Sequence, residues 1–264
     1  MVKVAMGDGV RINVETEGRE DGPPLVFSNS LATNFSMWDV QAKEAVGLGF
    51  RVIRYDQRGH GASDAPDGDY TLPRLAQDVI DLLDALGIET ASFCGLSMGG
   101  MTGMHLGKRH PRRFTRIALA NTAAAMPGRE IWDGRIKSAA ENGMAAIADG
   151  TIERWFTPAF RAEHPERVAP VRAMILATDP KGYGGCCAAI RDMDERDQLG
   201  LIDAPVLVIV GASDPSTPPQ RGQYVVERIP GARKAVIESA HLSNIEQPEA
   251  FNRLLFGFLT GERA

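Results

Sequence analysis

A serine stands between two glycines where the chain passes from an apolar segment into a helix-like one. The segment Gly95-Leu96-Ser97-Met98-Gly99 matches the pattern G-x-S-x-G. The apolar stretch Ala91 to Cys94 precedes it, and a helical pattern continues to Arg109. A serine on such a strand-to-helix turn exposes its hydroxyl, and the helix N-terminus favours negative charge beside it. Ser97 is therefore the candidate nucleophile, and the alternative is a serine that only caps the helix.

A serine hydroxyl needs a base to take its proton and a third group to orient that base. In chains with this turn, the acid and then the histidine follow later strands. Of the five histidines, His241 lies in a small-residue loop four residues after the strand-like segment Lys234 to Ile237, where the base is expected. Asp214 follows the strand-like segment Val206 to Val210 and is the candidate acid, because Asn121, after an earlier strand, has no carboxylate. The alternatives are an exposed loop histidine and an aspartate that only closes a turn.

Attack on an ester also requires hydrogen-bond donors for the oxyanion that forms. One candidate is the amide of Met98, directly after the nucleophile. The other is expected in the segment Ser28-Asn29-Ser30-Leu31-Ala32, which follows an early apolar strand. The side chain of Ser30 either offers a hydrogen bond to a substrate or closes the turn, and both interpretations remain open.

Strand-like and helix-like segments alternate along most of the chain, which predicts an α/β fold with a mostly parallel sheet covered on both faces. The expected strands are 10–17, 25–27, 51–55, 91–94, 116–120, 206–210 and 234–237, and the expected helices are 35–46, 72–86, 97–109, 220–228 and 248–259. The alternation stops at residues 122–196, where helix-like patches are separated by prolines and a glycine. We therefore expect a discontinuous core, residues 1–121 and 197–264, interrupted by a helical insertion, residues 122–196.

The composition excludes several classes of protein. The chain has 264 residues, of which 44% are apolar and 24% charged, as is typical of a soluble globular protein and not of a disordered one. A net charge of −5 argues against a nucleic-acid partner, which would need a basic surface. The chain shows no apolar run of membrane-spanning length and no secretory signal, so we expect neither membrane association nor export.

Three cysteines do not make a disulfide framework. We expect reduced thiols in a cytoplasmic protein, although the adjacent Cys186 and Cys187 leave a strained vicinal bridge open. No Cys/His cluster and no dinucleotide fingerprint indicates a metal or an organic cofactor. The oligomeric state is left open by the sequence.

Several of these segments carry a family resemblance. The stretch from Tyr55 to Asp64 (YDQRGHGASD), together with the serine turn, the acid and the histidine, resembles the α/β-hydrolase superfamily over the whole chain. The sequences SNSL at 28–31, FCGLSMGG at 93–100, ANTA at 120–123 and SAHLSNIE at 239–246 are most similar to 3-oxoadipate enol-lactonases. The resemblance implies an α/β-hydrolase fold and, as oxyanion donors, the amides of Leu31 and Met98. One departure is Ala32, where the family usually has glycine. If that glycine has a positive φ, the backbone conformation of the segment 28–32 differs in this chain.

The resemblance further implies a small anionic lactone as substrate, no cofactor, and inserted helices that form a cap over the catalytic residues. The segment Ile131 to Arg135 (IWDGR) resembles the part of that cap that faces the substrate. Arg135 would bind the free carboxylate of the lactone, and Trp132 would contact its ring. The alternatives are an arginine on an exposed cap face and a tryptophan that packs the cap onto the core. Arg154 and its neighbours Trp155 and Phe156 are weaker candidates for contact with the substrate, and packing of the core is the favoured interpretation for them.

Other hydrolases of the same fold share the general residues. A carboxylesterase, a different lactonase and a perhydrolase are therefore alternatives to an enol-lactonase. An alternative of another class is a non-catalytic protein that uses this fold to bind a ligand.

Overall fold

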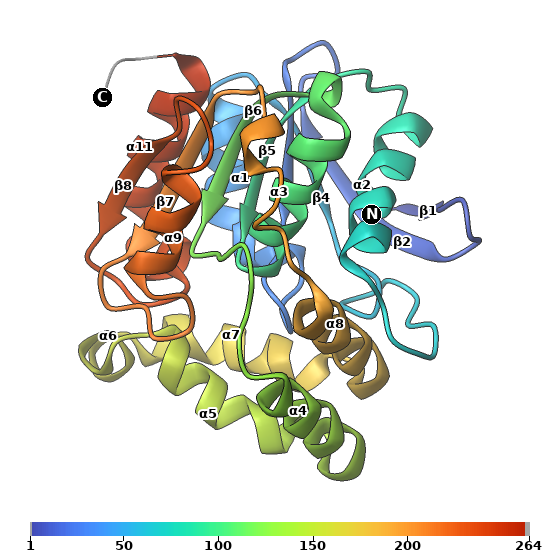
Figure 1. The fold of residues 1–264 in the computed structure, drawn as a ribbon, viewed down its shortest axis with the longest axis vertical. Coiled ribbons are helices and arrows are strands. Elements are labelled where there is room, and N and C mark those ends of the chain that lie inside the picture. The colour runs from blue at the N-terminus through green and yellow to red at the C-terminus, as the bar shows by residue number, and fades with distance from the viewer. Residues whose placement is uncertain (1, 262–264) are drawn as a thin grey trace.

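The computed structural model describes residues 2–261, which form an eight-stranded sheet with helices on both faces (Figure 1). The strands are β1 (Val2–Ala5), β2 (Arg11–Gly18), β3 (Pro24–Ser28), β4 (Arg51–Tyr55), β5 (Ala91–Leu96), β6 (Phe114–Ala120), β7 (Val206–Gly211) and β8 (Arg233–Ile237). Their order in the sheet is β1-β2-β4-β3-β5-β6-β7-β8. The pairs β1–β2 and β2–β4 are antiparallel, and all the other pairs are parallel. The predicted fold class is confirmed.

Strand β1 is the one strand that the sequence pattern did not predict. It has only four residues, three of which are exposed, and it pairs with β2 at the edge of the sheet. An edge strand of this kind has no buried face and therefore no apolar alternation to reveal it. The central strands β5 and β7 are buried at every residue, which explains why they read as continuous apolar runs.

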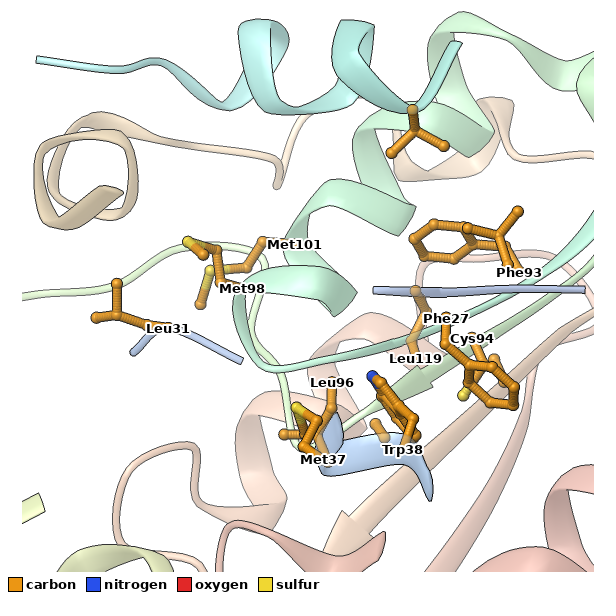
Figure 2. Close-up of a cluster of buried hydrophobic side chains, with 14 of the residues drawn as sticks. Phe27, Leu31, Met37, Trp38, Phe93, Cys94, Leu96, Met98, Met101 and Leu119 are labelled. Carbon is orange, nitrogen blue, oxygen red and sulfur yellow. The ribbon is translucent and has the colours of Figure 1, made fainter. Parts of the chain in front are cut away.

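Two pairs of helices cover the sheet. Helices α1 (Asp39–Gly47) and α11 (Pro248–Thr260) pack together, as do α2 (Leu72–Ala85) and α3 (Met98–Arg109), and Figure 1 shows the pairs on opposite faces. Gly103 brings α3 close to the sheet, because a Cβ at this position would lie 2.8 Å from the ring of Phe93. Figure 2 shows the apolar cluster formed between these layers, with Leu31, Met98 and Met101 at one end.

Five helices lie between β6 and β7: α4 (Arg129–Asn142), α5 (Ala145–Trp155), α6 (Pro158–Glu163), α7 (Pro165–Ala177) and α8 (Pro180–Asp192). They are gathered below the sheet in the view of Figure 1. Proline occupies the start of α6, α7 and α8, where its fixed φ suits a helix and no hydrogen-bonded amide is lost. A single antiparallel bridge, between Ala125 and Asp194, joins the two ends of this helical segment.

The remaining helices are short. They are η1 (Phe35–Trp38), η2 (Pro111–Arg113), η3 (Leu199–Leu201), α9 (Pro219–Val226) and α10 (Ser243–Glu246). Among residues 2–261, no helix combines the length and the apolar character that crossing a bilayer requires. Cys94, Cys186 and Cys187 are free, buried thiols, so the vicinal bridge left open by the sequence is not formed.

Candidate active site

Ser97 occupies a strained turn between β5 and α3. Its φ is +57°, a value that side-chain-bearing residues rarely adopt. The turn is held by a hydrogen bond from the Ser97 amide to the carbonyl of Ala120, at 2.9 Å. Glycine is required at position 95, because a Cβ there would lie 2.2 Å from the carbonyl oxygen of Gly99. The turn therefore presents the hydroxyl at the N-terminus of α3, as the motif predicts.

The three residues selected from the sequence as nucleophile, base and acid are hydrogen-bonded in series. Nε2 of His241 lies 2.9 Å from Oγ of Ser97, and Nδ1 of His241 lies 2.8 Å from Oδ2 of Asp214. These residues follow β5, β8 and β7, which run parallel, so their carboxyl ends meet at the same edge of the sheet. All three side chains are buried. The geometry is that of a serine activated by an oriented imidazole.

Asp214 is held as a carboxylate by five hydrogen bonds. Its Oδ2 accepts from His241, from the hydroxyl of Thr217 at 2.7 Å and from the side-chain amide of Asn121 at 3.1 Å. Its Oδ1 accepts from the amides of Ser216 and Thr217 at 2.8 and 3.0 Å. Burial by itself opposes ionisation, but the positive charge of His241 and the hydrogen bonds from His241 and Thr217 lower the pKa of Asp214 below its usual value. Asp214 thus stays charged to stabilise an imidazolium.

Asn121 is a site residue that sequence reasoning dismissed. Its Nδ2 donates to Asp214 and, at 3.2 Å, to the carbonyl of Ala240, next to the base. Its Oδ1 accepts from the hydroxyl of Ser243 at 2.5 Å. Its backbone has a φ of +44°, which turns the chain sharply at the end of β6. The position of Asn121 directly after a central strand indicates that its side chain lies at the site. Asn121 cannot be the acid, because it has no carboxylate, but its amide can donate to one.

The segment Asn29 to Ala32, here called the oxyanion loop, lies beside the nucleophile turn. The carbonyl of Asn29 accepts from the amide of Gly99 at 3.0 Å, which ties the loop to the start of α3. Between residues 2 and 261, the amides of Leu31 and Met98 donate no hydrogen bond. They are therefore available for an oxyanion, as the family resemblance implies. Ala32 has a φ of +58°, so it adopts the left-handed conformation that glycine would favour.

The hydroxyl of Ser30 is a second free donor in this loop. The residue is 1% exposed, it lines the cavity beside Ser97, and its Oγ has no hydrogen-bond partner in the described part of the chain. The turn is closed instead by Thr33, whose hydroxyl donates to the Ser30 carbonyl at 2.8 Å. The interpretation in which Ser30 only closes a turn therefore accounts for its carbonyl but not for its side chain.

A cavity of about 220 Å³ opens between Ser97 and the inserted helices. Trp132 and Arg135, the two residues selected from the segment 131–135, both line it, and the guanidinium of Arg135 lies 4.7 Å from the centre of the Trp132 ring. Two further arginines, Arg154 and Arg221, line it as well. The described lining includes no Asp or Glu. The cavity is therefore apolar with a concentration of positive charge.

The position of Arg154 and Trp155 is compatible with substrate contact, which was the weaker of the two interpretations drawn from the sequence. Both line the cavity, whereas Phe156 does not. Burial, together with the positive charge of Arg135, lowers the pKa of Arg154, and both arginines line the same cavity. Neither forms an ion pair with a carboxylate among residues 2–261. A helical pattern indicates which residues share a face but not that this face borders a cavity, so the position of Arg154 at the cavity could not be predicted from that pattern.

The inserted helices also contact the loop that carries the base. The carbonyl of Trp155, at the end of α5, accepts from the amides of His241 and Leu242, both at 3.1 Å. The buried carboxylate of Glu246 accepts from the hydroxyl of Thr157 at 2.5 Å and from the amide of Ala240 at 2.9 Å. The position of His241 therefore depends on the inserted segment as well as on the sheet.

None of the other four histidines lines the cavity. His105 contacts Glu195, His60 contacts the amide of Ala32, and His164 contacts Glu166. Within residues 2–261, no group of three or more His, Cys, Asp or Glu side chains is arranged to hold a metal ion.

Comparison with known proteins places this geometry in a family. The sequence model of the alpha/beta hydrolase fold family matches residues 23–248. The chain belongs to this family. One relative, the 3-oxoadipate enol-lactonase 2 of Acinetobacter baylyi, is 45% identical over 92% of this chain and 91% of its own length. The solved structure of the enol-lactonase from Burkholderia xenovorans LB400 superposes with a TM-score of 0.96 at 41% identity, and covers 98% of this chain and 100% of that one.

A more distant relative in the same family is named for another reaction. The putative carbamate hydrolase RutD of Agrobacterium fabrum is 30% identical over 94% of this chain and 98% of its own length. The predicted resemblance to alpha/beta hydrolases, and within them to enol-lactonases, is confirmed by the higher identity of the enol-lactonases.

Proposed function

We propose that this protein is a serine hydrolase that opens the ester bond of 3-oxoadipate enol-lactone and releases 3-oxoadipate. The observation that carries this proposal is a single cavity that joins the Ser97–His241 pair to the guanidinium groups of Arg135 and Arg154. Arg135 and Arg154 are half-buried and have no acidic partner among residues 2–261, an arrangement that an esterase for neutral substrates would not need. The names of the relatives at 45% and 38% identity support the same substrate.

The reaction follows from the hydrogen bonds of the site. His241 takes the proton of Ser97 through Nε2 while Oγ bonds to the carbonyl carbon of the lactone. Asp214 stabilises the imidazolium through Nδ1, and the amides of Leu31 and Met98 donate to the oxyanion, with roughly 3 kcal/mol of transition-state stabilisation per donor. The ring C–O bond then breaks, and His241 returns the proton to the leaving enol oxygen.

A second half-reaction frees the enzyme. The enol tautomerises to the ketone, which leaves the product joined to Ser97 as an ester. His241 then takes a proton from water, the hydroxide oxygen bonds to the acyl carbon, and the Ser97 oxygen leaves with the proton from His241. Each step uses only these side chains, the two amides and water.

The inserted segment supplies the substrate-binding residues of this proposal. Residues 122–196 act as a cap on the core formed by residues 1–121 and 197–264. Arg135 and Arg154 bind the free carboxylate of the lactone, which requires donors that stay charged. Trp132 provides a flat apolar surface for the ring. The unpartnered hydroxyl of Ser30 donates to the substrate on the side of the oxyanion loop.

The charge-recognition step is tested with Arg135→Ala. Loss of a charge-assisted hydrogen bond of about 1.5–3 kcal/mol lowers kcat/KM for the enol-lactone by roughly 10- to 150-fold. Hydrolysis of neutral p-nitrophenyl acetate changes by less than about threefold, since it offers no carboxylate. Arg129→Ala is the matched control, because Arg129 lies on the same helix, is exposed and pairs with Asp192. An equal loss on both esters would assign Arg135 a structural role instead.

A carboxylesterase, another lactonase or a perhydrolase would use the same Ser97, His241 and Asp214. A panel of neutral esters and lactones separates these reactions from the proposed one. The enol-lactone is expected to have the highest kcat/KM of the panel. Turnover of the neutral esters with none of the enol-lactone would replace the proposal with a general esterase. Failure of a fluorophosphonate to label Ser97 would favour a non-catalytic binding protein.

A further inference from the structure

We propose that His60 is a positioning residue of the oxyanion loop, holding Ala32, and with it the amide of Leu31, in place beside the nucleophile. His60 lies in the loop after β4, does not line the cavity and takes no part in the proposed reaction steps. The inference rests on the proposed serine-hydrolase function. It assigns a role to a residue that is neither the nucleophile, the base nor the acid.

The contact between His60 and the loop is a short, buried hydrogen bond. The amide of Ala32 donates to Nε2 of His60 at 2.8 Å. Since Nε2 accepts, the ring proton resides on Nδ1, which donates to the carbonyl of Arg58 at 3.2 Å. Both His60 and Ala32 are 1% exposed, so water does not compete for this bond. Burial lowers the pKa of His60, which keeps the ring neutral and Nε2 free to accept.

The hydrogen bond from His60 is made to the loop residue whose backbone conformation is least favourable. Ala32 has a φ of +58°, and its Cβ makes this left-handed conformation unfavourable. At its first residue the loop is tied to α3 through Asn29 and Gly99, and Ser30 is tied to Thr33. Between these ties, in the described part of the chain, His60 is the side chain that fixes the peptide joining Leu31 to Ala32. Losing the bond would let this peptide rotate and displace the neighbouring Leu31 amide.

His60 is itself held by the inserted segment. Helix α8 lies against its loop so closely that a Cβ on Gly182 would be 2.2 Å from the carbonyl oxygen of Gly59. From the same helix, the thiol of Cys186 lies 4.0 Å from Nδ1 of His60 and 3.7 Å from the Arg58 carbonyl. The ring therefore cannot shift away from Ala32 without moving α8.

Two substitutions at position 60 separate the hydrogen bond from the rest of the side chain. His60→Gln keeps an amide oxygen at about the reach of Nε2, whereas the shorter side chain of His60→Asn places its amide near Nδ1 and leaves the Ala32 amide without an acceptor. On p-nitrophenyl acetate, His60→Asn is expected to lower kcat roughly 10- to 100-fold with KM changed less than about threefold, since an oxyanion donor acts in the transition state. His60→Gln is expected to stay within about fivefold of the native kcat.

A third substitution tests whether the backbone of Ala32 is what His60 holds. Glycine adopts a positive φ without penalty. Ala32→Gly is therefore expected to raise kcat in the His60→Asn background by at least about threefold more than the same substitution does in the native background. A His60→Asn variant that keeps its kcat within about twofold would overturn the inference. So would an Ala32→Gly effect that is the same in both backgrounds.

The tautomer of His60 can be measured in the native protein, without any substitution. The ¹⁵N shifts of the His60 ring in the native protein should show a protonated Nδ1 and an unprotonated Nε2, and the opposite tautomer would overturn the inference. Fluorophosphonate labelling keeps the two proposals apart. A native protein that is neither labelled nor active on the ester contradicts the serine-hydrolase function itself, whereas a labelled native protein with unaffected His60 variants contradicts only the role of His60.

Discussion

Asn121 joins the acid to the loop that carries the base, because its side-chain amide donates both to Asp214 and to the carbonyl of Ala240. Ser97, Asp214 and His241 were predictable because each follows a strand of a parallel sheet, and the ends of such strands converge. The role of Asn121 was not predictable, because its place directly after β6 indicates that it lies at the site but not that its amide links the acid to the Ala240 carbonyl. The positive φ of Ala32 could not be predicted from the residue type. Only the resemblance pointed to it, because the family usually has glycine at this position.

The role of Asn121 is tested with Asn121→Ala. The substitution removes a donor to Asp214, one of the two side-chain donors to the Ala240 carbonyl, and the acceptor of the Ser243 hydroxyl. We expect kcat to fall roughly tenfold with little change in KM, since one charge-assisted hydrogen bond to a group that stabilises the transition state is lost. Steady-state kinetics on p-nitrophenyl acetate measure this. A larger effect on KM than on kcat would mean that Asn121 shapes the cavity and does not orient the acid.

The sequence predicts whether a segment is a helix or a strand better than it predicts which helices and loops pack together. The alternation of apolar strands and amphipathic helices placed the core strands to within a few residues, and the proline-interrupted stretch 122–196 was recognised as helical. Which helix packs on which loop was not predictable, since the close approach of α8 to the loop after β4 depends on two glycines 123 positions apart, Gly59 and Gly182. Neither glycine is informative by itself.

The packing of α8 is tested by two alanine substitutions on the same helix. Gly182→Ala would place a Cβ against the backbone of Gly59, so the helix must shift, and we expect a loss of about 2–3 kcal/mol in the free energy of unfolding together with reduced kcat. Gly184→Ala meets only Ile136, at an ordinary 3.6 Å, and is expected to be neutral or to stabilise by up to about 1 kcal/mol through helix propensity. Urea denaturation compares them, and equal stability of the two variants would contradict the close packing.

The two ends of the inserted segment are tied to each other, and its C-terminal end is also tied to helix α3. Glu195, at the C-terminal end of the inserted segment, donates its backbone amide to the carbonyl of Ala124, near the N-terminal end. The buried carboxylate of Glu195 also contacts two residues of α3, His105 at 3.1 Å and Lys108 at 2.6 Å. Burial by itself raises its pKa, but the hydrogen bonds and charges of His105 and Lys108 lower the pKa of Glu195 below its ordinary value of 4.5. Helix α3, which begins directly after Ser97, is thus joined to the end of the inserted segment.

The pH dependence of stability tests this connection. Because the folded-state pKa of Glu195 is lowered, its contribution is fully present above the unfolded pKa near 4.5 and is lost as pH falls through the lower folded value. Glu195→Gln leaves the buried Lys108 unpaired and is expected to lower the free energy of unfolding by about 3 kcal/mol at pH 6. This difference should shrink as pH falls below 4.5. Asp194→Asn, at an exposed ion pair with Arg196, is the control and should change stability by less than about 1 kcal/mol. A difference for Glu195→Gln that grows toward acid pH would contradict the assignment.

A protein of net charge −5 that binds an anion must do so through a local concentration of cations, and the cavity arginines provide it. The most direct test of the account is therefore the hydrolysis of freshly generated 3-oxoadipate enol-lactone by the native protein and by Ser97→Ala. The account predicts rapid turnover by the native protein and a loss of roughly 10⁴-fold or more in the variant. Near-normal turnover by Ser97→Ala, or no turnover of the lactone by a native protein that hydrolyses neutral esters, would contradict it.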